Sequence, residues 1–191
     1  IVLSASRLQQ NQSDAPVAIT VIDNDMIEAS GAINLADLMR LVPGFQVGMV
    51  NGNIFAVTSH GATFEFPRKL QVLIDGRSVY RPLLSNVDWV SLGISLSDIE
   101  RIEVIRGPNV PVYGTNAFLG TVNIITKQPF QYSGLHLELL SGSNDSKYGV
   151  LSYSQTHSKL SYRLTLEHSE DSGFEDINDE SNINMSSFKG V

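Results

Sequence analysis

Cysteine is absent from the 191 residues, so neither a disulfide framework nor a thiolate metal site is available. No run approaches the roughly 18 apolar residues that a membrane-spanning helix needs, which excludes a helical anchor within these residues. Positive charge is sparse, with 13 basic against 20 acidic side chains and a formal net charge of -7. Because nucleic-acid binding depends on grouped basic residues, we expect no nucleic acid as a partner.

The composition is that of a folded protein, with 42% hydrophobic and 17% charged residues. Up to about residue 128 the chain mixes short helical and strand patterns, which indicates an α+β fold. Asp23 to Asp25 can cap a short helix that Gly31 ends, and Asn34 can cap a second that Pro43 and Gly44 stop. Strands are predicted over 17–22, 45–50, 54–58, 70–74, 99–105 and 121–125.

After residue 133 the pattern becomes purely β, with three alternating segments at Gly134–Ser141, Lys147–His157 and Lys159–Ser169. In the third segment the apolar residues from Leu160 to Leu166 fall on one face and the polar residues on the other. Strands of this length and alternation are typical of a transmembrane β-barrel, although a soluble antiparallel sheet would also suit them. Three strands cannot close a barrel, so the pattern predicts an incomplete one.

Three stretches carry a resemblance to a known family: 97–108 (SDIERIEVIRGP), 112–117 (VYGTNA) and 120–127 (GTVNIITK). Together with three stretches upstream, 14–22, 35–44 and 72–76, they resemble the plug domain of TonB-dependent outer-membrane receptors. The resemblance implies a plug domain over 1–128, built as a small mixed β-sheet with short helices. Residues 129–191 would then be the N-terminal fragment of the β-barrel, with about three antiparallel strands and an acidic loop.

The resemblance also implies a function: a plug that gates a barrel in the outer membrane of a Gram-negative bacterium and helps to bind a scarce ligand. A ferric siderophore is the commonest ligand class of such receptors, with cobalamin, haem, other metal chelates or sugars as alternatives. The partners would be TonB on the periplasmic side, the ligand, and the remainder of the barrel. A soluble β-rich binding or adhesion module is the alternative from another class of protein.

Two sets of contact residues follow from the resemblance. A TonB-binding segment, which would add as a strand to its partner, is expected at the N-terminus, where a frayed strand is the alternative. Its residues are Ile1, Val2, Leu3, Ser4 and Ala5. Ligand contacts are expected in loops at the outer apex of the plug, where ordinary surface loops are the alternative. These residues are Asn51, Asn53, His60, Tyr80, Arg81, Asn86, Asp88 and Trp89.

Arg101, Glu103 and Arg106 lie along one predicted strand, and we expect them on roughly the same side of it. The resemblance implies that they hold the plug against the barrel, whereas a solvated charged face is the alternative.

Catalytic and metal chemistry find no support in the residue spacing. The four histidines lie on separate segments without a paired-ligand spacing, and neither a nucleophile elbow nor a carboxylate dyad is present. We therefore expect no enzyme, no cofactor and no metal site. The acidic run 170–180 is expected to be a solvated loop, with calcium binding as the alternative.

Overall fold

The computed structural model describes most of the chain between residues 17 and 171, together with a later strand. The described residues are Val2, Asn11, 17–51, 54–59, 69–81, 83, 86–114, 116–143, 145–158, 160–171 and 183–190. None of the helices within these ranges is long and apolar enough to cross a membrane.

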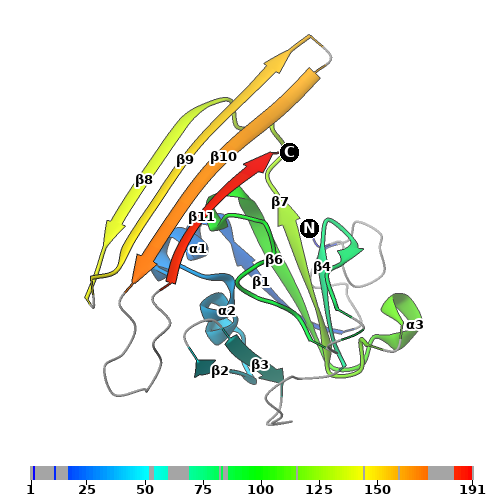
Figure 1. Ribbon diagram of the computed structural model, residues 1–191. Coiled ribbons are helices and arrows are strands. Elements are labelled where there is room, and N and C mark those ends of the chain that lie inside the picture. Colours follow the sequence, from blue (N-terminus) through cyan, green and yellow to red (C-terminus); the bar gives the residue numbers. More distant parts are fainter. Residues whose placement is uncertain are drawn as a thin grey trace.

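The first part of the chain forms a five-stranded sheet, which we call the mixed sheet (Figure 1). Its strand order is β1-β6-β7-β4-β5, and β4 runs parallel to β7 while the other pairs are antiparallel. The strands are β1 (Ala18–Asp23), β4 (Leu70–Ile74), β5 (Arg77–Ser78), β6 (Ile99–Arg106) and β7 (Gly120–Thr126). A mixed α+β plug sheet was the expectation, and it is confirmed.

The two predicted helices form where their capping residues lie. The Asp23 side chain accepts from the Met26 backbone N–H at 2.9 Å to begin α1 (Asn24–Ser30), and Gly31 ends it at φ 64°. The Asn34 side chain caps α2 (Leu35–Leu38) in the same way, and the last turn tightens into the 3-10 helix η2 (Met39–Leu41). Two further short turns are η3 (Leu96–Asp98) and α3 (Val110–Tyr113).

The main hydrophobic core lies between one face of the mixed sheet and these helices. The antiparallel hairpin of β2 (Phe45–Asn51) and β3 (Ile54–Ser59) adds Phe45, Phe55 and Val57 to it. Alternation along the strands decides which residues enter, because Val72, Val104 and Val122 point into this core while their neighbours point to the other face. A smaller cluster on that other face joins Val2 to Ile19 and Ile105.

A second, four-stranded antiparallel sheet, the long sheet, curves along one side of the mixed sheet (Figure 1). Its order is β11-β10-β9-β8, and its members are β8 (Gly134–Ser141), β9 (Lys147–His157), β10 (Leu160–Asp171) and β11 (Ile183–Gly190). The predicted bounds of β8 and β9 are confirmed. About three strands were expected, and the structure adds a fourth, because β11 pairs with β10 from Leu164 to Asp171.

Candidate functional site

The outward face of the long sheet exposes apolar side chains, whereas its inward face buries mostly polar side chains of β9 and β10, with Tyr148 and Val150 among them. The large apolar residues exposed on the outward face of β8, β9 and β10 are Leu135, Leu137, Leu139, Leu151, Tyr153, Leu160, Leu164 and Leu166. The opposite face holds Ser152, Ser154, Arg163 and Thr165, all buried against the mixed sheet. Apolar exposure on this scale is unusual for a protein surrounded by water, so the outward face needs an apolar environment.

The strand register places the outward residues in cross-strand rows. Leu137 pairs with Leu151, which pairs with Leu166, and these three leucines form the middle row. Towards one end of the apolar band, one row before Leu160, the side-chain oxygen of Gln155 accepts hydrogen bonds from the hydroxyls of Tyr153 at 2.7 Å and Tyr162 at 3.0 Å.

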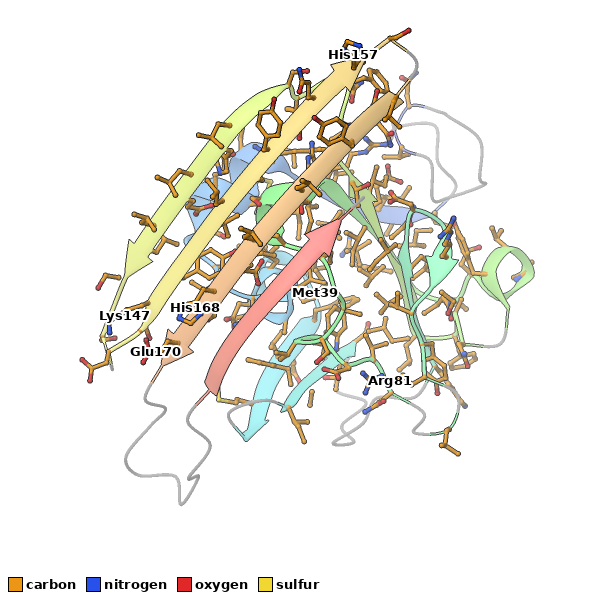
Figure 2. The ribbon with its side chains drawn as sticks, turned by 45° about the horizontal axis from the view of Figure 1, so that its top comes forward. Met39, Arg81, Lys147, His157, His168 and Glu170 are labelled. Atoms are coloured by element: carbon orange, nitrogen blue, oxygen red, sulfur yellow. The ribbon has the colours of Figure 1, made fainter. Side chains whose placement is uncertain are left out.

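The other boundary is charged. Lys147 lies 3.7 Å from Glu170 across β9 and β10, with Ser141 of β8 in the same row. Figure 2 shows Lys147 and Glu170 at one end of the long strands and His157 at the other. Aromatic groups with hydrogen-bonded hydroxyls at one boundary and charges at the other are what the two surfaces of a membrane favour.

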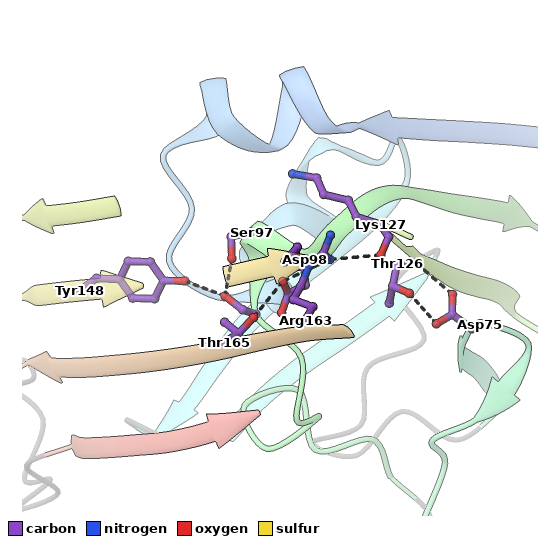
Figure 3. Close-up of polar contacts among 10 residues, drawn as sticks. Asp75, Ser97, Asp98, Thr126, Lys127, Tyr148, Arg163 and Thr165 are labelled. Atoms are coloured by element: carbon purple, nitrogen blue, oxygen red, sulfur yellow. Dashed lines mark hydrogen bonds and ion pairs between the residues drawn. The ribbon is translucent and has the colours of Figure 1, made fainter. Parts of the chain in front are cut away.

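A buried polar network joins the inward face of the long sheet to the mixed sheet (Figure 3). The Arg163 guanidinium donates from Nε to Ser154 Oγ at 2.8 Å, and from Nη1 to Asp98 Oδ1 at 3.4 Å and to the Lys127 carbonyl at 3.1 Å. The Thr165 hydroxyl donates to the same Asp98 oxygen at 3.1 Å. Arg163 therefore binds Ser154 on the long sheet and, at the same time, Asp98 of η3 and the residue that follows β7.

Flanking contacts extend this network. The Lys127 N–H donates to the Asp98 carbonyl at 2.8 Å, which closes the end of β7 onto η3. The hydroxyls of Ser95 and Tyr148 lie 3.5 Å apart, a weak second link between the sheets. Burial lowers the pKa of the Lys127 ammonium and outweighs the opposing effect of nearby Glu28.

The three charged residues predicted to hold the plug against the barrel do not share a side. Arg101 and Glu103 do, since Arg101 Nε donates to Glu103 at 2.9 Å and its Nη1 to Glu100 at 2.7 Å. The expectation of a shared side is wrong for Arg106, because β6 pairs regularly with β7 from residue 101 to 106 and the interval of three from Glu103 places Arg106 on the opposite face. Arg101 forms ion pairs with Glu100 and Glu103 of the same strand, within the mixed sheet.

Part of the predicted ligand set gathers in the loop after β5. Arg81 and Asn86 form an isolated β-bridge, and the Arg81 guanidinium lies 2.7 Å from an Asp88 oxygen. Tyr80 precedes this turn and is partly exposed. Trp89 differs from them, because its indole is buried in the main core and is not available to a ligand. Figure 2 shows Arg81 toward the end of the molecule that carries Lys147 and Glu170.

Several predicted residues are located only in part. Asn51 ends β2, at the tip of the β2–β3 hairpin, whereas Asn53 and His60 lie outside the described residues. Of the expected TonB-binding segment only Val2 is described, and it is buried beside Ile19 and Ile105. Ile1, Leu3, Ser4 and Ala5 lie outside the described residues.

The acidic run begins within a strand rather than a loop, because Glu170 and Asp171 belong to β10; its remainder lies outside the described residues. In the part of the chain that the structure describes, no three His, Asp or Glu side chains gather as metal ligands do.

Sequence reasoning missed the residues that join the two sheets. The alternation along β10 predicted that Arg163 and Thr165 share a face, but nothing in the sequence paired them with Asp98. The pairing joins positions 65 and 67 residues apart, so only the folded chain brings these residues together.

Comparison with known proteins gives consistent matches. The model of the TonB-dependent Receptor Plug Domain family matches residues 11–121. The vitamin B12 transporter BtuB of Photobacterium profundum is 34% identical over 126 residues, which cover 66% of this chain and 20% of the transporter. The catecholate siderophore receptor Fiu of Escherichia coli is 30% identical over 143 residues, covering 75% of this chain and 18% of the receptor.

Solved structures agree in fold. The pyoverdine outer membrane receptor FpvA of Pseudomonas aeruginosa matches with a TM-score of 0.74 at 23% identity, over 89% of this chain and 24% of the receptor. The crystal structure of Fiu matches with a TM-score of 0.68 at 29% identity, over 88% of this chain and 24% of that one. The chain spans about a fifth of the length of the curated relatives it matches. By the family model and these relatives, the chain belongs to the TonB-dependent receptor plug domain family.

Proposed function

We propose that the chain is the plug and the first barrel strands of a receptor in the outer membrane of a Gram-negative bacterium. In this proposal the mixed sheet and its helices obstruct the lumen, and the long sheet is part of the wall. The protein is a transport receptor and not an enzyme: it binds a scarce ligand outside the cell and admits it when TonB acts on the plug.

One observation carries this proposal: the long sheet turns leucines outward and buries Arg163 and Thr165 against the plug. Leu160 and Glu170 are ten positions apart on β10, a strand length of about 33 Å. Tilted by the usual ~40°, such a strand spans about 25 Å, the height of the apolar band on outer-membrane barrels. A soluble binding module has no use for an apolar outer face of this height.

For the ligand we propose a ferric siderophore or a related metal chelate, with cobalamin as the second candidate. Fiu is named as a catecholate siderophore receptor, FpvA as a pyoverdine receptor, and BtuB as a vitamin B12 transporter. Contacts would come from Tyr80, Arg81, Asn86 and Asp88 in the loop after β5. The other proposed contacts are Asn51, Asn53 and His60.

TonB would act at the periplasmic side on the segment Ile1, Val2, Leu3, Ser4 and Ala5. Because Val2 is buried against Ile19 and Ile105, TonB could grip this residue only after the segment leaves that small cluster.

Membrane flotation of the full gene product tests the proposal first. We expect the protein to float with outer-membrane vesicles after a high-salt wash, and a protein that stays in the soluble fraction would favour the adhesion module. Binding of ferric catecholate, ferric hydroxamate and cobalamin to the purified product then separates the ligand classes.

A further inference from the structure

We infer that Asp98 and Arg163 form an anchor that fixes the plug against the inner face of the wall, through a charge pair that neither part can bury alone. The inference rests on the proposed function only in calling the two parts plug and wall. The anchor consists of Asp98, Arg163, Thr165, Ser154 and the carbonyl of Lys127 (Figure 3).

Burial makes the charges of the anchor interdependent. The side chains of Arg163 and Asp98 are only 6% and 8% exposed, so water screens neither of them well. Removing one member of a buried ion pair leaves the other charge uncompensated, which costs far more than removing both. The pair therefore favours the arrangement in which plug and wall are in contact.

The shape of the guanidinium explains why an arginine occupies this position. Its planar fork can donate in several directions, and here it reaches Ser154 on the wall and both Asp98 and the Lys127 carbonyl on the plug. A lysine would carry the same charge but only a compact ammonium, and it could not span these three acceptors. Position 163 thus depends on geometry as well as on charge.

The anchor also lies where the chain passes from plug to wall. Lys127 directly follows β7, and β8 begins at Gly134. The Lys127 backbone contacts Asp98 through its N–H at 2.8 Å and Arg163 through its carbonyl at 3.1 Å. A side-chain anchor at the covalent crossing limits rotation of the plug about the linker, which the linker alone would permit.

Hydrogen exchange of the full gene product, folded in detergent micelles, tests this role. We expect Arg163→Met to raise the exchange of the 95–106 segment by more than about 100-fold, because the buried Asp98 carboxylate loses the guanidinium that balances its charge. Arg163→Lys should give an intermediate rise. The double variant Asp98→Asn with Arg163→Met should exchange more slowly than Arg163→Met alone, since no unpaired charge remains.

Arg40→Met is the control, because it also removes an arginine from an ion pair, but the pair that Arg40 forms with Asp37 is largely exposed and lies on α2 and η2. It should leave the exchange of the 95–106 segment unchanged. Equal exchange of the Met and Lys variants at position 163, or a double variant that exchanges as fast as Arg163→Met alone, would overturn the inference. Failure of membrane flotation would contradict the proposed function, but the coupling between Asp98 and Arg163 could still be measured by hydrogen exchange.

Discussion

Placing an arginine in the middle row of the outer face should destabilise the protein only if that face meets lipid. Leu137 lies in the centre of β8, is 62% exposed, and heads the row that continues through Leu151 and Leu166. Leu137→Arg would put a charge near the middle of the apolar band. The same strand offers a control at Leu140, which lies three positions away and therefore on the opposite face.

The expected loss of folding free energy depends on how deep the new charge lies in the bilayer. An arginine on the lipid face near the bilayer midplane costs about 2–4 kcal/mol of folding free energy. At a site exposed to water, a surface substitution usually changes stability by less than about 0.5 kcal/mol. Leu140→Arg faces the polar interior and should stay near that lower value.

Equilibrium unfolding of the full gene product in lipid vesicles, followed by tryptophan fluorescence against guanidinium concentration, measures the difference. We expect a clear fall of the midpoint for Leu137→Arg and a small change for Leu140→Arg, with similar slopes. Equal midpoints for the two variants would refute the assignment of the outer face to lipid.

Three further predictions concern the plug. Gly120→Ala should cost about 1–3 kcal/mol in thermal unfolding, because a Cβ would meet the Ile105 carbonyl oxygen at 2.8 Å. Gly48→Ala should be nearly neutral, because a Cβ there meets no atom within 4 Å. Equal losses of stability in the two variants would contradict this account of the β6–β7 contact. Asp23→Ala should cost about 1 kcal/mol of stability, because α1 loses its N-cap hydrogen bond, whereas Asp23→Asn should retain most of the capping stabilisation. An Asn variant as unstable as the Ala variant would contradict the capping role. Burial lowers the pKa of Lys127, so the folded state binds fewer protons than the unfolded state, and the free energy of unfolding should rise with pH from the lowered pKa up to the usual 10.5. Lys127→Met should flatten that rise. An unchanged pH dependence in the variant would contradict the role of Lys127.

The sequence predicted the helices and strands that depend on residues close together in the chain. The caps of α1 and the bounds of β8 and β9 follow from nearby residues, because capping side chains and period-two alternation act over a few positions. The same alternation predicted which face of β10 is apolar. The missed strand β11 lacks such a pattern, since its apolar residues Ile183, Met185 and Phe188 are not evenly spaced.

Contacts between distant segments could not be predicted in this way. The anchor depends on how β10 packs against η3, and the sequence carries no pattern that pairs Asp98 with Arg163. The burial of Trp89 has the same origin: its position in a polar loop segment favoured a ligand contact, but the fold turns its indole into the core. The expected side of Arg106 was wrong for a simpler reason: Glu103 and Arg106 are an odd number of positions apart, so a regular strand places them on opposite faces.

Single-cysteine scanning along β10 tests the central claim most directly, and the chain itself contributes no cysteine to interfere. A polarity-sensitive fluorophore would be attached at positions 160 to 168 of the full gene product in lipid vesicles, and its quenching by lipid-attached spin labels recorded. The account predicts strong quenching at Leu164 and Leu166 and little at Arg163 and Thr165, with a period of two. Two results would contradict the account: equal quenching by the lipid-attached labels at all positions, or no quenching by them where a water-soluble quencher acts at every position.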